Sequence, residues 1–459
     1  MAGRVAFNMY CNILVLVQVS ELGLVTTSHR GAAQVTSRHV LLRRLSRHHG
    51  GALVIVKRML AAQNILVVGG GLTGAAAGRA LCRLLPPGSN VVVWEALDFL
   101  GGRFHTERSV DGGACDTGAQ YITITDDAAV AADNAPLFAE LASAGILAPL
   151  RGRIEGGRAA DGGGANYVAP AGLSSVVSHL FASAGLEPTR ARRAVSLRVA
   201  PSAGRPRGLW ELGSSEGHVQ SFDGVVLTQP LPEMMGLLDS GDGGAWLSDA
   251  PADAGAAPGG RLSRASMNAI QYSSRYALTL FFAPAAAARF ASEIDWVSRY
   301  ITKDEDDAIV YLGHDSAKRA SGRSAAADDA TTELMSLIVH TSVPYGIKRL
   351  KEGAAEADVT ADLLERVRKL LPWLPEPEHV LLKPWRVSQV RTPLALPAEA
   401  PSACWLLTPT ESAAADSAAA SAPPLVLAGD AFSPLGSRFD GCIQSGEGAA
   451  KAMLAALAA

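Results

Sequence analysis

The chain has 459 residues, too many for one simple core, so two domains are expected. Hydrophobic residues make up 48% and charged residues 19%, a balance that excludes a disordered or fibrous protein. The formal net charge is −3, but residues 1–58 hold eight Lys or Arg against one acid, which leaves −10 for the rest. An acidic body of this kind gives no footprint for nucleic acid.

Residues 1–58 form a basic segment that is rich in Ser, Thr and His. This composition is typical of an organellar transit peptide; an extension of the coding sequence that the folded protein does not need is an equally weighted alternative. No run reaches the roughly 18 apolar residues that span a bilayer. Five scattered cysteines without C-x-x-C spacing predict no disulfide framework, no metal site and a reducing intracellular compartment. That compartment would be a chloroplast or mitochondrion with a transit peptide, and the cytoplasm without one.

The first folded unit is predicted to be strand, glycine turn, helix and strand. An apolar strand at residues 64–68 breaks directly into Gly69-x-Gly71-x-x-Gly74 and an Ala-rich helical pattern. Such a turn brings backbone N–H groups and a helix N-terminus onto a pyrophosphate. A second apolar strand, residues 91–94, ends in Glu95, which is placed to hold a ribose hydroxyl pair. The unit therefore predicts a dinucleotide site that favours FAD or NAD over a 2′-phosphorylated dinucleotide.

The middle of the chain alternates low-complexity stretches with compact apolar runs. Three stretches offer almost nothing large to bury and are predicted to be exposed insertions: 239–260, 316–332 and 410–424. The runs at 276–282 and 334–339 are predicted to be strands of a second domain. Residues 359–371 carry apolar side chains at helical spacing and stop before Pro372, which predicts a helix.

The C-terminus repeats the pattern of the first unit. A strand at residues 425–428 runs into Gly429-Asp430, and Phe439-Asp440-Gly441-Cys442 leads into a small-residue helix predicted over 443–457. A strand that ends in Gly-Asp, followed by the N-terminus of a helix, offers a second site of free amides and helix dipole. One nucleotide-binding domain assembled from both chain ends explains this order.

Further motifs carry a resemblance to a known family. Gly101-Gly102-Arg103 follows the second strand, and Asp116-Thr117-Gly118-Ala119-Gln120-Tyr121 comes next. With the glycine turn, these resemble the FAD-binding core of the flavin amine oxidase superfamily, and within it the chain looks like the renalase family. The stretches that carry the closer resemblance are 118–123, 166–170, 272–278, 340–346, 385–390 and 439–443.

The resemblance implies an α/β fold with two domains and a non-covalent FAD. A Rossmann-like FAD-binding domain would comprise residues 59–140, 187–238 and 425–459, after an N-terminal extension at 1–58. An inserted α+β substrate domain on a mixed sheet would comprise 141–186 and 239–424. The expected cofactor contacts are Gly69, Gly71, Thr73, Gly74, Glu95, Arg103, Gln120, Tyr121, Val195, Gly429, Asp430, Gly441, Cys442 and Ile443. Glu95 occupies a ribose-binding place where Asp is common, and Gly429-Asp430 would address the ribityl–phosphate side. Gly441-Cys442-Ile443 would place backbone N–H groups by the pyrimidine end of the flavin.

Three residues are candidates for the catalytic, substrate-facing side. Trp385 can stack against a planar ring, and His340 can hold a carboxamide or ribose oxygen. Tyr276, the third, lies in an apolar strand that also fits a core position. Structural alternatives stand beside the others: His340 as a satisfied polar residue at a strand end, and Trp385 as packing between domains.

No general base emerges from the residues, which suits removal of a hydride from a dihydropyridine, because no proton must leave. The resemblance implies oxidation of 2- or 6-dihydro isomers of NAD(P) to NAD(P)⁺, with O₂ reduced to H₂O₂. An amine oxidase acting on a primary or secondary amine is the first alternative, and an FAD-binding protein with a signalling role is the second. The expected partners are the dihydro-NAD(P) substrate and O₂, with no nucleic acid and no membrane span. The sequence leaves open the oligomeric state and the choice between the NAD and NADP forms.

Overall fold

The computed structural model describes residues 60–156, 165–249, 262–322, 334–396, 403–409 and 422–459. The expectation for residues 1–58 falls outside them. Residues Leu60–Ala459 form one compact unit. Within the described residues, no helix is both long and apolar enough to span a bilayer.

A five-stranded sheet joins the two ends of this unit, as the sequence predicts. Its order is β18-β19-β12-β1-β2, with β18 antiparallel to β19 and the other pairs parallel. The bounds are Asn64–Val68 (β1), Asn90–Trp94 (β2), Gly224–Leu227 (β12), Cys404–Leu407 (β18) and Leu425–Ala428 (β19). The central strands are runs of buried Val, Ile and Leu, the pattern of parallel strands covered on both faces. Strand β18 comes from inside the predicted substrate segment.

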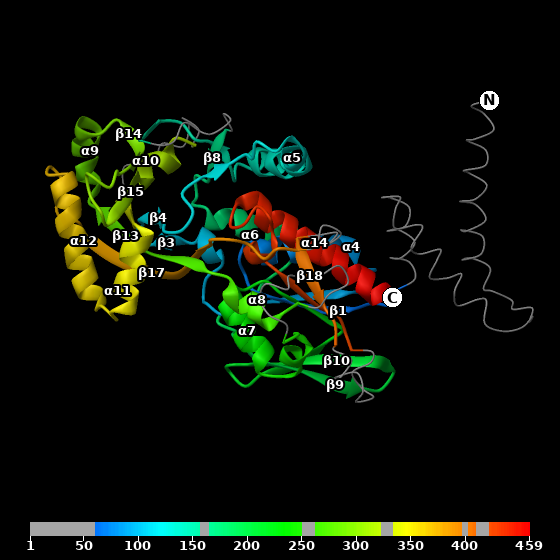
Figure 1. The fold of residues 1–459 in the computed structure, drawn as a ribbon. Helices are drawn as coiled ribbons and strands as arrows, with labels where there is room; N and C mark the ends of the chain where they lie inside the picture. The colour runs from blue at the N-terminus through cyan, green and yellow to red at the C-terminus, as the bar shows by residue number, and fades with distance from the viewer. Residues whose placement is uncertain (1–59, 157–164, 250–261, 323–333, 397–402, 410–421) are drawn as a thin grey trace, which may run out of the picture. The chain divides into compact units, whose positions relative to one another are not determined.

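Two helices begin at the carboxyl ends of these strands. Helix α4 (Leu72–Leu84) follows β1, and α14 (Phe439–Ala458) follows β19 and packs along α4 (Figure 1). A Cβ on Gly446 would lie 2.5 Å from the Thr73 carbonyl oxygen, so glycine permits this close approach. Helix α14 begins four residues before the predicted start, because the extended Arg438 serves as its N-cap and Asp440 suits its first turn.

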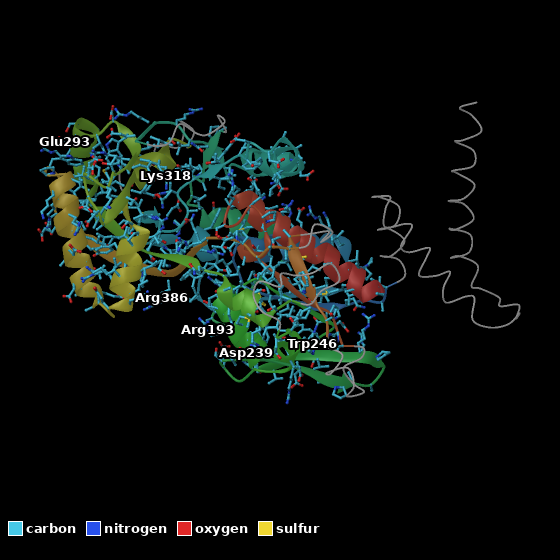
Figure 2. The ribbon with its side chains drawn as sticks, viewed as in Figure 1. Arg193, Asp239, Trp246, Glu293, Lys318 and Arg386 are labelled. Atoms are coloured by element: carbon cyan, nitrogen blue, oxygen red, sulfur yellow. The ribbon has the colours of Figure 1, made fainter. Side chains whose placement is uncertain are left out.

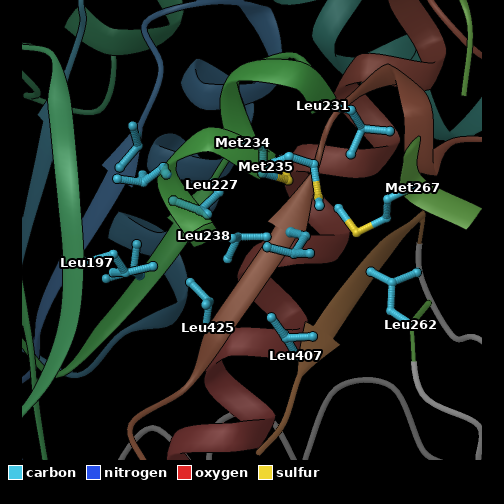
Figure 3. Packing of buried hydrophobic residues seen from close by; sticks show 14 of the residues in the cluster. Leu197, Leu227, Leu231, Met234, Met235, Leu238, Leu262, Met267, Leu407 and Leu425 are labelled. Atoms are coloured by element: carbon cyan, nitrogen blue, oxygen red, sulfur yellow. The ribbon is translucent and has the colours of Figure 1, made fainter. Parts of the chain in front are cut away.

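A cluster of buried hydrophobic side chains packs against this sheet (Figure 3). It joins Leu227 and Leu425 to α7 (Leu231–Asp239) and to a three-stranded antiparallel sheet. The strands of that sheet are Ala194–Ser202 (β9), Arg205–Ser214 (β10) and Val219–Phe222 (β11). Trp246 is part of the cluster, so the start of the predicted insertion 239–260 is core rather than exposed loop. The indole of Trp246 packs on Trp210 at 5.0 Å between ring centroids, a contact that the surrounding small residues conceal in the sequence.

A six-stranded mixed sheet forms the second layer system, in the order β17-β13-β16-β15-β14-β7. All pairs are antiparallel except β14 with β7. The bounds are Arg153–Glu155 (β7), Tyr272–Phe282 (β13), Trp296–Tyr300 (β14), Ile309–His314 (β15), Met335–Thr341 (β16) and His379–Val390 (β17). The two predicted strands of the second domain are therefore neighbours here, as β13 and β16.

The two faces of this sheet differ in what covers them. On one face, α12 (Glu356–Leu370) buries Val359, Leu363 and Val367 against the strands, and α11 (Val343–Lys351) contacts β13. On the other face lies a smaller cluster of buried side chains. It includes Cys115 of β4 (Ala114–Asp116), the strand that leads into the Gln120 motif. This second face is the one that meets the N-terminal motifs.

The remaining strands and α-helices connect these sheets or lie beside them. They are the strands Thr106–Arg108 (β3), Ile122–Thr123 (β5), Ala148–Pro149 (β6) and Asn166–Val168 (β8), and the helices Ala128–Ser143 (α5), Ser174–Ala182 (α6), Arg264–Ala269 (α8), Ala287–Glu293 (α9) and Asp315–Ala320 (α10). Helix α10 contradicts the prediction of an exposed insertion at 316–332, because Lys318 and Arg319 are buried there (Lys318 is labelled in Figure 2). Residues 323–333 and 410–421 lie outside the described residues.

Candidate cofactor and substrate site

The glycine turn after β1 contains two glycines that the fold itself requires. Gly69 has a φ of +118° and donates its N–H to the Trp94 carbonyl oxygen at 2.8 Å, which joins the turn to β2. A Cβ on Gly74 would lie 1.9 Å from the Gly69 carbonyl oxygen. Any side chain at Gly74 would therefore break the turn.

Gly71 is different, because nothing in the protein explains its lack of a side chain. A Cβ there would meet no atom closer than 3.9 Å, and the residue has an extended φ of −88°. It is the N-cap of α4 without a side-chain cap, so the N–H groups of Leu72, Thr73 and Gly74 have no acceptor within the helix. The open space beside Gly71, in front of these donors, is what a pyrophosphate needs.

Glu95 holds the turn from β2. Its Oε2 accepts from the Gly70 N–H at 2.6 Å and its Oε1 from the Leu97 N–H at 2.8 Å. Burial raises the pKa of this carboxyl, and the backbone donors partly oppose that rise. The Arg192 N–H donates to the Glu95 carbonyl oxygen at 2.7 Å, so the segment leading to Val195 passes beside Glu95. The Val195 side chain is exposed on β9.

Arg103 and Asp430 bring together the Gly101-Gly102-Arg103 motif and the C-terminal Gly429-Asp430 motif. The Arg103 guanidinium forms an ion pair with the buried Asp430 carboxylate, and Ser437 donates to the same carboxylate oxygen at 2.5 Å. Burial alone would raise the pKa of Asp430, but Arg103 and Ser437 outweigh it and hold that pKa below its usual range. Gly429, at φ +133°, turns the chain from β19 into this position. Arg103 also donates to the Ser388 carbonyl oxygen of β17 at 3.4 Å.

The first turn of α14 lies beside this ion pair, and it corrects one detail of the prediction. The Cys442 N–H donates to the Arg438 carbonyl oxygen at 3.1 Å, so it is the first bond of the helix rather than a free donor. The free N–H groups belong to the preceding turn, which includes Gly441, and Ile443 lies one residue further into the helix. Burial raises the pKa of the Cys442 thiol to about 11, which keeps it protonated and fits a packed thiol.

Across the sheet, Gln120 connects two of the motifs. Its Nε2 donates to the Asp116 carbonyl oxygen at 2.6 Å and lies 3.3 Å from Nε2 of His340. Its Oε1 accepts from Nζ of Lys318 at 3.0 Å. Because Lys318 can only donate, the amide nitrogen of Gln120 must face His340. Nε2 of His340 then accepts, and a neutral imidazole carries its proton on Nδ1.

The pKa of His340 is lowered to about 3, first by desolvation and then by the charges of Arg275 and Lys318. The pKa of a histidine in the unfolded chain is about 6.5. Between about pH 6.5 and 3 the unfolded chain therefore binds a proton at this histidine, whereas the folded protein does not. Stability is therefore lost as pH falls below about 6.5. We expect wild type to lose on the order of 1–2 kcal/mol more than His340→Gln between pH 7 and 5, measured by denaturant unfolding. His218→Gln, at an exposed histidine, is the control; equal pH dependence of all three proteins would contradict a desolvated His340.

Trp385 and Tyr121 lie on the same side as His340. Trp385 donates its Nε1–H to the Thr117 carbonyl oxygen at 2.8 Å, which fixes the indole beside the Gln120 motif. Tyr121 shares a hydrogen bond of 2.6 Å with the Tyr300 hydroxyl. Burial and Tyr300 raise the pKa of Tyr121, so it stays protonated.

Tyr276 does not join this group. Alternation along β13 places it on the opposite face, where it is 2% exposed and packs in the hydrophobic cluster under α12. Its ring contacts Tyr345 in a T-shaped arrangement. The structure thus corrects the candidate role: Tyr276 is a core residue.

Two charged residues of the site were missed in the sequence. Lys318 lies in a low-complexity stretch, and no local signal marks it as buried. Arg275 interrupts an apolar strand and pairs in register with Trp385, so the alternation of β13 could have pointed to it. Within the described residues, no group of three or more His, Cys, Asp or Glu side chains is placed to hold a metal ion.

Comparisons with known proteins agree with this arrangement. The model of the family described as flavin containing amine oxidoreductase matches residues 305–454, and that of the NAD(P)-binding Rossmann-like domain matches residues 67–133. Renalase from Mus musculus is 29% identical over 376 residues, 82% of this chain and 94% of that protein. The crystal structure of a protein described as protoporphyrinogen oxidase, from Exiguobacterium sp. 255-15, matches with a TM-score of 0.56 and 13% identity. That match covers 86% of this chain and 99% of the other, and it shows the shared fold.

The fold and the comparisons together define an FAD-dependent oxidoreductase. Within that class, the chain is a renalase-like member of the flavin amine oxidase superfamily. The predicted superfamily, the α/β FAD-binding fold and the FAD cofactor are thereby confirmed. The residue-by-residue contacts and the domain boundaries stay predictions.

Proposed function

We propose that this protein oxidises 2- or 6-dihydro isomers of NAD(P) to NAD(P)⁺. The observation that carries the proposal is the pairing of a neutral His340 with a fixed Trp385, on a face where the described residues offer no candidate for a general base. Loss of a hydride from C2 or C6 of the dihydropyridine leaves an aromatic pyridinium, so no proton has to be removed. A site of this kind needs chiefly to hold two flat rings at a reactive distance.

The chain's residues divide between the two ligands in this proposal. Backbone donors at the N-termini of α4 and α14, with Glu95, Arg103 and Asp430, hold FAD. On the substrate side, Trp385 stacks against the dihydropyridine and His340 donates from Nδ1 to its carboxamide oxygen. When bound, FAD would supply the hydride acceptor for the dihydropyridine and would return the electron pair to O₂, giving H₂O₂. Lys318 and Gln120 orient the imidazole.

The charges around this group distinguish the two enzyme hypotheses. Nζ of Lys383 lies 5.1 Å from the ring centroid of Trp385, and Arg275 is its cross-strand neighbour. Amines carry a positive charge at neutral pH, and these cations would repel them. A dinucleotide carries negative charge and is attracted. Glu107 and Asp98 act on Lys383 and offset part of its charge, but no acid acts on Arg275, so the charge of Arg275 favours the dihydro-NAD(P) substrate over an amine.

Aerobic turnover tests the proposal. We expect the holoenzyme to form one NAD(P)⁺ and one H₂O₂ for each dihydro isomer and each O₂ consumed. Trp385→Ala should lower kcat/KM by about tenfold or more, because the ring loses its platform. Tyr276→Phe, on the opposite face, is the matched control and should turn over like wild type. H₂O₂ production from amines but not from the isomers would favour the amine oxidase. FAD binding without turnover of either class would favour the signalling role.

A further inference from the structure

Arg275 lies near the start of β13, on the substrate-facing side of the six-stranded sheet. It pairs in register with Trp385 on β17, and two residues further along β13 Ala277 pairs with His340 on β16. Ala277 packs on the face that carries Trp385, and alternation places Arg275 on that same face. Arg275 and His340 therefore lie on neighbouring strands of the same face, and after desolvation the positive charge of Arg275 contributes to the lowered pKa of His340.

The guanidinium of Arg275 has no acidic partner within the described residues. Its NH1 group donates to the Thr341 carbonyl oxygen at 3.4 Å, and the side chain is half-buried. Burial lowers its pKa, and no carboxylate acts against that shift. Three other cations near the site differ: Arg103 pairs with Asp430, Lys318 pairs with Asp315, and Lys383 is influenced by the charges of Glu107 and Asp98. A desolvated cation without a counterion is costly unless an anionic ligand completes it.

The position of Arg275 along β13 gives its distance from Arg103 and Asp430, the residues expected to hold the cofactor. Tyr272, at the start of the strand, pairs with Val390, whose N–H donates to the Ser437 hydroxyl that in turn donates to Asp430. Three residues of extended strand span about 10 Å, so Arg275 lies that far beyond this end, between it and His340. An anion bound by Arg275 therefore lies beside both Trp385 and His340.

We propose that Arg275 binds the pyrophosphate of the substrate dinucleotide while Trp385 and His340 hold its dihydronicotinamide. The pyrophosphate is separated from the nicotinamide by a single ribose, whereas the 2′-phosphate of the NADP form lies on the remote adenosine ribose. The nearness of Arg275 to Trp385 thus fits the pyrophosphate. A planar guanidinium offers paired donors that match two phosphate oxygens. This inference rests on the proposed function.

The test compares holoenzymes of wild type, Arg275→Met, Arg275→Lys and Arg386→Met in anaerobic flavin reduction. Arg386 (labelled in Figure 2) is the matched control: it is an exposed arginine on the next strand, and its charge acts on Tyr276 of the opposite face. We expect Arg275→Met to raise the half-saturating concentration of a dinucleotide isomer about 10- to 100-fold. Its limiting reduction rate should stay within about threefold of wild type, since the ring contacts remain. The half-saturating concentration of Arg275→Lys should lie between those of wild type and Arg275→Met, because a lysine keeps the charge without the paired donors.

Two substrate comparisons separate an anion contact from a general defect. Arg275→Met should raise the half-saturating concentrations of the NAD and NADP isomers by the same factor. An uncharged dihydronicotinamide isomer without phosphate should reduce wild type and Arg275→Met alike. An unchanged half-saturating concentration for the dinucleotide, or an equal loss with the uncharged isomer, would overturn the proposal. A loss confined to the NADP isomer would assign Arg275 to the 2′-phosphate and also overturn it.

Calorimetric titration of ADP-ribose into the FAD-saturated proteins keeps this inference distinct from the proposed function. Should no dihydropyridine isomer reduce the flavin, the proposed oxidation fails by itself. Binding of ADP-ribose to wild type and Arg386→Met that weakens in Arg275→Met would still support the anion site. Equal binding by wild type and Arg275→Met, or no binding by wild type, would refute it.

Discussion

Gly71→Val is expected to yield a folded protein that has lost nearly all of its FAD. A Cβ at this position meets no protein atom within 3.9 Å, so the chain itself tolerates the side chain. The valine would instead fill the space in front of the free N–H groups at the start of α4, where we place the pyrophosphate. The visible absorbance of the purified protein and its far-UV circular dichroism measure the two parts of this prediction.

The control for this variant is Gly236→Val. A Cβ on Gly236 also meets nothing within 4 Å, but this glycine is exposed on α7, away from the turn. It should keep FAD at wild-type stoichiometry. Stoichiometric FAD in Gly71→Val would show that the pyrophosphate lies elsewhere. Gly74→Ala should fail to fold with or without FAD, because its Cβ would lie 1.9 Å from the Gly69 carbonyl oxygen.

Lys318→Met is expected to lower the free energy of unfolding by about 3–5 kcal/mol. Lys318 is fully buried, with Nζ 2.6 Å from Oδ1 of Asp315 and 3.6 Å from Oδ2 of Asp116. Both carboxylates are also buried, and they raise the pKa of Lys318 although burial alone would lower it. The methionine fills similar volume but leaves the negative charge of two carboxylates opposed by Arg319 alone.

Lys369→Met provides the matched comparison for this loss. Lys369 also pairs with an acid, Glu365 at 2.6 Å, but both side chains are 70% exposed. Its replacement should cost about 0–1 kcal/mol, because water screens the pair. Denaturant unfolding of the FAD-saturated proteins measures both values. Equal losses in the two variants would show that the buried network around Lys318 does not stabilise the fold.

The elements that could be predicted from the sequence are those whose signal is local. The strand at 64–68, its glycine turn and the helix after it are consecutive in the chain, and the structure has them in the same order. The strand Leu425–Ala428 was predicted from four apolar residues ahead of Gly429-Asp430. In both cases a short pattern contains the whole reason for the structure.

What could not be predicted depends on partners far away in the chain. Lys318 is buried because Asp116 and Gln120, about 200 residues earlier, meet it, and the small residues after it conceal this. The face of β13 was also hard to assign, because from Tyr276 to Phe282 apolar side chains occupy both alternating sets and Arg275 is the one charged residue that marks a face. Only the packing under α12 decides that Tyr276 is core.

The substrate class is tested most directly by mixing FAD-saturated enzyme with the 2-dihydro isomer of NAD in the absence of O₂. We expect complete loss of the oxidised flavin absorbance, one NAD⁺ formed per FAD, and a slower rate when C2 carries deuterium. Flavin that stays oxidised with this isomer and its 6-dihydro counterpart, but is reduced by a primary or secondary amine, would contradict a dihydronicotinamide oxidase.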